Sequence, residues 1–316
     1  MKNLISVIMS TYNESEEWIS ESVQSILDQT YKNIEFIIVL DNPQNITLRN
    51  TLEKYAMQDK RIKIIPNECN IGLVKSLNRA LEYCNGYYII RMDADDVSLS
   101  NRIENQVNYL EKYSLDFVFS GLKIIDEHSN EMYSTNLKEY KPELVSKLLS
   151  ITNISNHPTW ILKKEVYDKL KGYRELSYTE DYDFTLRALQ ANYKIGKMPG
   201  YVLKYRVRKN SISRTFSLEQ FLNSDAALEA YKRGEINNEN IVNQILKRTS
   251  EKVSKNEIEK FISAENLFMG GINCYKNRKK IKGLYMIVRS LFKSKYNREK
   301  VVKMLNYKLI VRFRTG

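Results

Sequence analysis

The chain has 316 residues, of which 42% are hydrophobic and 28% charged, the balance of an ordinary globular protein with one large or two modest domains. No apolar run approaches the roughly 18–20 residues that a membrane-spanning helix needs, which argues against an integral membrane protein. The three cysteines are odd in number and far apart, so they fit a reducing compartment and indicate neither a disulfide framework nor a cysteine metal site.

The first third of the chain alternates strand signals with helix signals. Strands are expected where short apolar, β-prone runs occur, and helices where apolar residues recur with helical periodicity. In chain order these are a strand at 5–10, a helix at 14–29, a strand at 35–40, a helix at 47–57, a strand at 61–66, a helix at 71–84 and a strand at 87–92. The pattern is typical of an α/β fold with a mainly parallel sheet flanked by helices.

The rest of the chain is less regular and then entirely helical. The first apolar run lacks a signal-peptide cleavage site, so a cytoplasmic protein is expected. Residues 101–199 give mixed signals: a helix at 102–113, a strand at 117–124 and a helix that begins near 179–183. From about residue 217 every signal is helical. We therefore expect an α/β domain at 1–216, with halves at 1–100 and 101–216, and a helical region at 217–316.

The net charge of +12 is concentrated at the C-terminal end. Residues 276–316 contain 14 Lys or Arg and a single acid, Glu299, which gives +13. The other 275 residues hold 36 basic and 37 acidic groups and are almost neutral. This distribution predicts an appended basic surface with a partner of its own.

The run from Tyr87 to Asp96 joins an apolar strand signal to three carboxylates, Asp93, Asp95 and Asp96. Like charges this close repel one another, and a bound divalent cation such as Mg²⁺ or Mn²⁺ would relieve the repulsion. Because side chains alternate along a strand, Asp93 and Asp95 are expected on one face. The alternative is a solvated acidic turn, since short motifs also occur by chance.

Three expected strands end at polar residues, namely Ser10, Asp41 and Asp93. Open α/β sheets bind ligands outside the carboxyl ends of their strands, so these side chains are expected to converge on one crevice. The sequence lacks both G-x-G-x-x-G and G-x-x-x-x-G-K-[ST], which argues against a dinucleotide site or a P-loop.

Several ordered blocks together resemble an inverting family 2 glycosyltransferase of the GT-A fold. The resemblance runs from about Ile5 to Arg208, and its subtype is similar to bacterial enzymes that build capsule, exopolysaccharide or O-antigen. The blocks are 6–13 (SVIMSTYN), 22–31 (SVQSILDQTY), 37–42 (IIVLDN), 70–73 (NIGL), 80–81 (AL), 93–96 (DADD) with Arg102, 172–173 (GY) and 180–181 (ED). The halves 1–100 and 101–216 then correspond to nucleotide-binding and acceptor regions.

The resemblance implies a UDP-sugar donor and a metal, Mn²⁺ or Mg²⁺, held by the Asp93–Asp96 cluster. Asp95 or Asp96 would be the metal ligand, and Asp93 would belong to the donor site. The metal would bridge the phosphate oxygens and neutralise charge as the glycosidic bond breaks. Which of Asp95 and Asp96 contacts the metal, and which the ribose, is left open.

Further donor-site positions follow from the same resemblance. Asp41 corresponds to the residue that accepts a hydrogen bond from uracil, although an Asx-type turn before Asn42-Pro43 is the alternative. Ser10 and Tyr12 correspond to positions that line the base pocket, with ordinary strand-end packing as the alternative. Lys75 is a candidate for contact with the diphosphate, or else a solvated helix lysine.

Asp181 corresponds to the catalytic base of the family. An inverting transfer is one in-line displacement and needs a single carboxylate to take the proton of the acceptor hydroxyl. Glu180 is assigned to the acceptor site; alternatively, both acids only complement a helix N-terminus. His157 and Trp160, in the stretch NHPTW, are also assigned to the acceptor site, with a structural histidine as the alternative.

Arg208 is a departure from the family pattern, because many relatives have His there and that His can join the metal or diphosphate shell. Arginine cannot ligate a cation, but its planar fork can hold a phosphate. Arg208 is therefore predicted to bind the donor.

The C-terminal residues 276–316 carry apolar residues at helical spacing among many basic ones. A basic amphipathic helix can lie on an anionic membrane surface. We expect a peripheral protein on the cytoplasmic face of the plasma membrane, with an acceptor oligosaccharide carried on a lipid. The alternatives are a solvated helical cap or a homo-oligomer contact; nucleic acid is not expected, because no binding motif supports it.

Two classes of rival function remain open, another metal-dependent enzyme and a protein that is not an enzyme. A metal-dependent nucleotidyltransferase would be expected to carry a glycine-rich first loop, and residues 10–13 contain no glycine. A phosphatase with an Asp nucleophile would carry its carboxylates after the first strand. A degenerate transferase that acts as a scaffold at the membrane surface is the non-enzymatic alternative.

Overall fold

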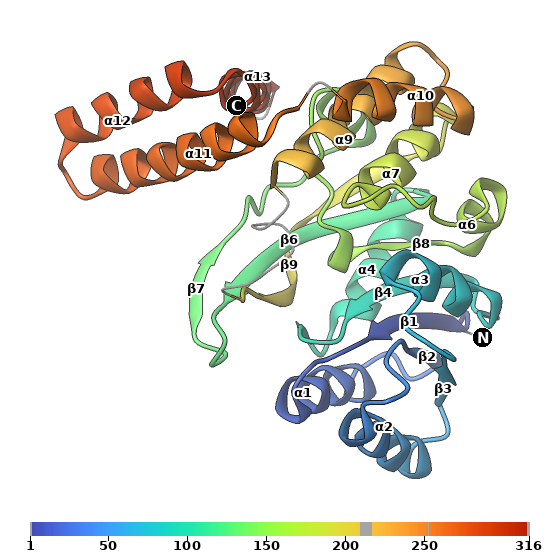
Figure 1. Ribbon diagram of the computed structural model, residues 1–316. Helices are drawn as coiled ribbons and strands as arrows, with labels where there is room; N and C mark the ends of the chain where they lie inside the picture. The colour runs from blue at the N-terminus through green and yellow to red at the C-terminus, as the bar shows by residue number, and fades with distance from the viewer. Residues whose placement is uncertain (1, 209–216, 252, 315–316) are drawn as a thin grey trace. The chain divides into compact units, whose positions relative to one another are not determined.

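A computed structural model gives the positions of residues 2–208, 217–251 and 253–314 (Figure 1). The chain divides into two compact units. The first unit comprises the described residues of Met1–Ser146, Ser155–Glu175 and Arg187–Lys209. The second comprises those of Lys147–Ile154, Leu176–Leu186 and Asn210–Gly316.

The first unit is built on a sheet whose opening strands are parallel. β1 (Ile5–Thr11), β2 (Ile34–Leu40), β3 (Ile62–Pro66) and β4 (Tyr88–Asp93) pair in the order β3-β2-β1-β4. β1, β2 and β4 are almost completely buried, which explains why their sequences are nearly continuous apolar runs. The four predicted strands are confirmed.

Beyond β4 the sheet contains strands of both directions. β8 (Ile161–Lys163) pairs antiparallel with β4 and with β6 (Phe117–Ile125), and β9 (Ile195–Arg206) runs parallel to β6. β5 (Val97–Ser98) pairs with β9, and β7 (Glu131–Ser134) with β6. In the described residues, nine strands therefore form one mixed sheet. The predicted α/β fold class is confirmed.

β7, β8 and β9 lie in the stretch whose sequence pattern was too irregular to predict strands. β9 contains Gly196, Pro199 and Gly200, residues that usually interrupt a strand, and its pairing with β6 shifts register twice. Gly200 has a φ of +78°, a conformation that glycine adopts readily. The irregular sequence thus belongs to a bulged strand and not to a loop.

The first two helices begin at side chains that cap them. Ser15 accepts a hydrogen bond from the backbone of Trp18 at the start of α1 (Glu16–Leu27). Asn45 does the same for Leu48 in α2 (Ile46–Gln58). The next helices are α3 (Leu73–Glu82), α4 (Arg102–Lys112), α5 (Pro142–Leu149), the 3₁₀ helix η1 (His157–Thr159), α6 (Lys164–Leu170) and α7 (Glu180–Gln190).

From residue 217 onward the described residues form helices and their connections, as predicted. The helices are α9 (Ser217–Lys232), α10 (Glu239–Ser250), α11 (Lys255–Lys276), α12 (Lys280–Lys293) and α13 (Lys295–Arg314). α11 and α12 form an antiparallel hairpin, drawn in orange and red in Figure 1. Within the described ranges, none of the helices combines the length and apolar character that crossing a bilayer requires.

Candidate active site

The strand register brings the three predicted strand ends together. Ser10 on β1 lies opposite Asp93 on β4 and opposite Val39 on β2. The backbone N–H of Asp41 donates to the carbonyl of Thr11 at 2.8 Å. Because neighbouring strands are about 4.8 Å apart, Asp41 and Asp93 flank the end of β1 on either side. This is the carboxyl edge at which open α/β sheets bind ligands.

The Asp41 carboxylate orders the loop before α3. It accepts hydrogen bonds from Asn67 Nδ2 at 2.7 Å, from the N–H of Ile71 at 2.8 Å and from the N–H of Gly72 at 2.9 Å. Asn67 Nδ2 also donates to Ser76 Oγ at 2.9 Å, within α3. Asp41 is buried, so in this conformation its carboxylate serves the loop, and its contact with uracil stays a prediction.

Asp93 is paired with a buried cation on its own strand. Arg91 donates to both of its carboxylate oxygens, at 2.9 Å and 2.6 Å. This is the bidentate geometry that makes arginine–carboxylate pairs strong. The backbone carbonyl of Asp93 also accepts from Ser22 Oγ in α1 at 2.9 Å, so the start of the DADD segment is fixed from two sides.

Asp95 is paired with Arg208, the residue that departs from the family pattern. Arg208 Nε donates to Asp95 Oδ2 at 2.6 Å, and a second guanidinium nitrogen contacts the same oxygen. The guanidinium also lies 3.6 Å from Glu14 Oε1 and 5.1 Å from the Trp18 ring centroid. Burial raises the pKa of Asp95, the charge of Asp93 adds to this, and Arg208 opposes it. Burial likewise raises the pKa of Glu14.

Asp96 points into the protein. Its Oδ1 accepts the backbone N–H of Arg206 at 2.9 Å, and the described residues offer no hydrogen-bond partner to its buried Oδ2. Burial, and then the charges of Asp95 and Asp93, raise the pKa of Asp96 well above its ordinary value. Asp96 is also a counter-charge to the buried Arg102. The side chain of Asp96 has no exposed surface. Asp95 is therefore the better candidate for a metal ligand.

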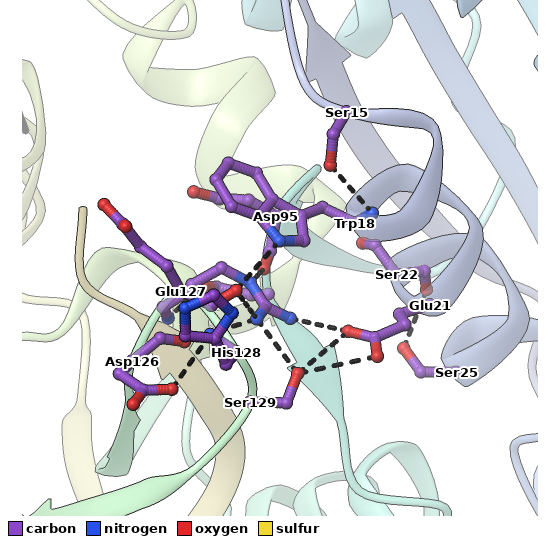
Figure 2. A network of polar contacts seen from close by, with 12 residues as sticks. Ser15, Trp18, Glu21, Ser22, Ser25, Asp95, Asp126, Glu127, His128 and Ser129 are labelled. Carbon is purple, nitrogen blue, oxygen red and sulfur yellow. Dashed lines mark hydrogen bonds and ion pairs between the residues drawn. The ribbon is translucent and has the colours of Figure 1, made fainter.

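Arg206 holds the DADD segment in place. Its Nε donates to the backbone carbonyl of Asp95 at 2.8 Å, and its other nitrogens contact Glu21 Oε2 at 2.6 Å and Ser129 Oγ at 2.9 Å. The carbonyls of Asp126 and Glu127 accept further bonds at 3.3 and 3.4 Å. Figure 2 shows these partners converging from α1, from the DADD segment and from the turn between β6 and β7.

Arg206→Met is expected to lower the free energy of unfolding by about 3 kcal/mol, because the guanidinium is buried and satisfies carbonyls and Glu21 together. Arg248→Met is the matched control, since Arg248 pairs with Glu229 at the surface and such pairs contribute about 1 kcal/mol or less. Urea denaturation of both variants measures the difference. Equal losses in the free energy of unfolding would show that Arg206 does not anchor the DADD segment.

His157 and Trp160 lie in a buried aromatic cluster. His157 Nε2 is 2.9 Å from the hydroxyl of Tyr173, and the imidazole centroid is 4.3 Å from that of Trp160. Arg102 and Gln106 in α4 bind the backbone carbonyls of Pro158 and Thr159 at 2.8 and 2.6 Å. Trp160 has no exposed surface and His157 very little. In this conformation the segment packs the core, which favours the structural alternative. The contact of His157 and Trp160 with the acceptor stays a prediction.

Burial, with a smaller contribution from Arg91, holds the pKa of His157 well below its ordinary 6.5. Below about pH 6.5 the unfolded chain binds a proton that the folded chain excludes, so stability falls as the pH falls. In His157→Gln, the change of the free energy of unfolding with pH is expected to be smaller by about 1.4 kcal/mol per pH unit. Urea denaturation between about pH 5 and 7 tests it, with the exposed His128→Gln as control. An unchanged slope in His157→Gln would refute the assignment.

Two other predicted donor residues lie at the surface. Tyr12 is exposed just beyond β1, and its backbone N–H donates to Glu14 Oε2 at 2.8 Å. Its side chain is therefore available to a base, and its role stays a prediction. Lys75 forms an exposed ion pair with Glu175 at 3.3 Å. This arrangement is compatible with the alternative of a solvated helix lysine.

Asp181 belongs to the second unit, in the first turn of α7. Its Oδ2 accepts from Asn153 Nδ2 at 2.9 Å, and its Oδ1 accepts from the N–H of Tyr182 at 2.7 Å. The side chain is partly exposed. Glu180, Asp181 and Asp183 place negative charge at this helix start, which the helix dipole favours. A held, partly exposed carboxylate is suited to accept a proton, and its role as base stays a prediction.

The model of the family described as "Glycosyl transferase family 2" matches residues 6–171, more than half of the chain. The chain belongs to this family. Among the relatives of this glycosyltransferase is the O-antigen biosynthesis glycosyltransferase WbnJ of Escherichia coli, 33% identical over 232 residues, a match that covers 70% of this chain and 89% of the relative. The enzyme class predicted from the sequence is confirmed.

Two solved structures show that this family 2 glycosyltransferase has the GT-A fold. TarS 1-349 of S. aureus in complex with UDP-GlcNAc superposes with a TM-score of 0.58 at 19% identity, covering 99% of this chain and 92% of that one. The mannosyltransferase PcManGT of Pyrobaculum calidifontis, in complex with GDP-Man and Mn²⁺, gives a TM-score of 0.59 at 16% identity, covering 94% and 88%.

A metal implied by the family has to fit the carboxylates present in this glycosyltransferase. In residues 2–208, 217–251 and 253–314, no group of three or more His, Cys, Asp or Glu is arranged to hold a metal. Of the DADD carboxylates, Asp93 is neutralised by Arg91 and Asp96 is buried. Asp95 is itself paired with Arg208, but its side chain is partly exposed and Arg208 can bind a phosphate instead. Mg²⁺ is usually bound by one or two carboxylates together with substrate phosphates. The oxygen donors therefore fit a cation shared with the substrate.

Sequence reasoning missed Glu14, Arg91 and Arg206 in this glycosyltransferase. Glu14 directly follows the matched block 6–13, and Arg91 lies two positions before Asp93, so both were close to recognised residues. Arg206 lies in an irregular stretch and contacts partners roughly 80 to 185 residues away in the chain. The only local signal for Arg206 was its position two residues before Arg208.

Proposed function

We propose that this glycosyltransferase moves a sugar from a UDP-sugar, with inversion, to a hydroxyl of an oligosaccharide in bacterial surface polysaccharide synthesis. The observation that carries the proposal is the register that gathers Ser10, Asp41 and Asp93 at the carboxyl edge of the sheet, next to Asp95. The O-antigen relative supports the pathway, and the TarS complex with UDP-GlcNAc supports a nucleotide-sugar donor.

In this proposal the donor diphosphate lies beside Asp95 and Arg208. A divalent cation bound at Asp95, when present, supplies positive charge to the phosphate oxygens as the leaving group departs. Arg208 supplies a fixed positive charge at the same place, and the fork that it now directs at Asp95 equally suits two phosphate oxygens. Ser10 and Tyr12 line the base pocket, and Asp41 orders the adjoining loop.

The reaction needs one base. Asp181 takes the proton of the acceptor hydroxyl as the acceptor oxygen bonds to the anomeric carbon, while the bond from that carbon to the diphosphate oxygen breaks and UDP leaves. One displacement inverts the anomeric centre, so no covalent enzyme intermediate is formed. We place Glu180 beside the acceptor, because it starts the same helix.

We propose further that the acceptor is carried on a membrane lipid and that the enzyme acts as a peripheral protein on the inner face of the plasma membrane. The basic residues of 276–316 support this location, since the cytoplasmic leaflet is anionic.

Thermal unfolding with a panel of UDP- and GDP-sugars tests the donor assignment. A UDP-sugar with Mn²⁺ is expected to raise the unfolding temperature, since a ligand that binds only the native state stabilises it, and GDP-sugars are expected to have less effect. Slow Mn²⁺-dependent hydrolysis of the same UDP-sugar would distinguish an enzyme from a scaffold. If no nucleotide sugar stabilises the protein or is hydrolysed, the proposed function is wrong.

A further inference from the structure

α12 contacts its hairpin partner α11 through one narrow face. A Cβ at Gly283 would lie 2.7 Å from the carbonyl oxygen of Gly271 and from the N–H nitrogen of Tyr275, so the two backbones are nearly in contact. Gly283 and Ser290 are the buried residues of α12. Both therefore mark the inner face of this helix, and side chains on its opposite side point away from α11.

The opposite side of α12 carries large apolar side chains. At about 100° per residue, they cluster within an arc of roughly 100° whose centre is nearly opposite Gly283 and Ser290. Ile281 and Phe292, at the two ends of this stripe, are 89% and 83% exposed. The outer stripe, as we call this set, consists of Ile281, Leu284, Tyr285, Val288 and Phe292, all of which are exposed.

Cations border the outer stripe on both sides. Lys282, Arg289 and Lys293 fall about 100° to one side of the stripe, and Lys280 falls about 100° to the other. α12 contains no Asp or Glu. α13 also has exposed apolar residues spaced by three and four positions, namely Val302, Leu305, Leu309 and Phe313.

We propose that the outer stripe of α12 docks on an anionic lipid bilayer, with the apolar side chains in the interface and the flanking cations against the headgroups. An exposed apolar stripe between rows of cations is the pattern of a helix that lies in the plane of a membrane. A second copy of the chain is a poorer partner, because an isologous contact would bring the cations that border the two stripes together. The inference deepens the proposed location and does not depend on the transfer chemistry.

Sedimentation of the full chain with vesicles tests the docking surface, in the absence of donor and acceptor. Binding to phosphatidylcholine vesicles that contain phosphatidylglycerol is expected to exceed binding to pure phosphatidylcholine and to weaken with salt. The triple variant Lys282→Gln, Arg289→Gln, Lys293→Gln is expected to lose about a hundredfold in affinity. The double variant Ile281→Ser, Phe292→Ser is expected to lose about tenfold or more.

Met57→Ser is the matched control, since Met57 is a similarly exposed apolar residue on α2, and its vesicle affinity should equal that of the unchanged protein. Light scattering of the same samples reports self-association. The proposal is overturned if the stripe variants bind vesicles as well as Met57→Ser does, or if the unchanged chain forms a dimer that Ile281→Ser, Phe292→Ser abolishes. Donor hydrolysis by the stripe variants should persist, so a failure here is distinguishable from a failure of the proposed function.

Discussion

Asp181→Asn is expected to lower the turnover number by about a hundredfold to ten-thousandfold, because an amide cannot take the proton of the acceptor hydroxyl. Its affinity for the donor should stay near that of the unchanged enzyme. The substitution keeps the size of the side chain and removes one of the two hydrogen bonds accepted from Asn153 and Tyr182. Folding should therefore survive with a modest loss of stability. Steady-state kinetics with a varied donor measures both quantities.

Glu219→Gln is the control for Asp181→Asn. Glu219 lies in the first turn of α9 and is exposed, so the variant makes the same carboxylate-to-amide change at the start of a neighbouring helix in the sequence. Normal turnover is expected for Glu219→Gln. If Asp181→Asn also turned over normally, Asp181 would be left with the capping role that its helix position allows.

Asp95→Asn is expected to remove activity without removing stability. The amide would no longer hold a cation beside the diphosphate, and turnover should fall by at least about a hundredfold, as when other groups that stabilise a charged transition state are removed. The same charge is costly in the folded protein, since burial and Asp93 raise the pKa of Asp95. At neutral pH the variant should therefore unfold at the same temperature as the unchanged protein or at a higher one.

The sign of this stability effect follows from the direction of the shift in pKa. With a folded pKa above the unfolded one, Asp95 favours folding when protonated and loses that contribution as the pH rises through the folded pKa. An amide at this position does not titrate. The gain in stability of Asp95→Asn over the unchanged protein should therefore be present at neutral pH and absent in acid. A lower unfolding temperature at neutral pH, with activity retained, would contradict the assignment of Asp95 as a functional carboxylate.

The strongest sequence patterns predicted the part of the fold that positions the site. β1, β2 and β4 are buried on both faces, so their apolar runs were continuous and their ends were easy to locate. Because parallel strands end at one edge, the meeting of Ser10, Asp41 and Asp93 followed from the strand prediction alone. β9 was missed because Gly196, Pro199 and Gly200 interrupt its pattern, although its pairing with β6 is extensive.

The roles of neighbouring residues could not be separated from the sequence. Asp95 and Asp96 are adjacent acids, and only the fold shows that Asp96 turns inward to the backbone of Arg206 while Asp95 meets Arg208. His157 and Trp160 were assigned to the acceptor site because a similar stretch occurs in the polysaccharide-assembling subtype of the family. The buried Arg102 of α4 binds the backbone carbonyl of Pro158, and this contact favours a place in the core.

The central claim is that the carboxyl edge of the sheet, with Asp95, holds the diphosphate of a uridine nucleotide together with a cation. Isothermal titration of UDP into the protein, with and without Mn²⁺, tests this most directly. We expect Mn²⁺ to strengthen UDP binding to the unchanged protein and Asp95→Asn to lower the affinity in Mn²⁺ by about tenfold or more. UDP binding that is equally strong in Asp95→Asn, or that is independent of Mn²⁺ in both proteins, would contradict the claim.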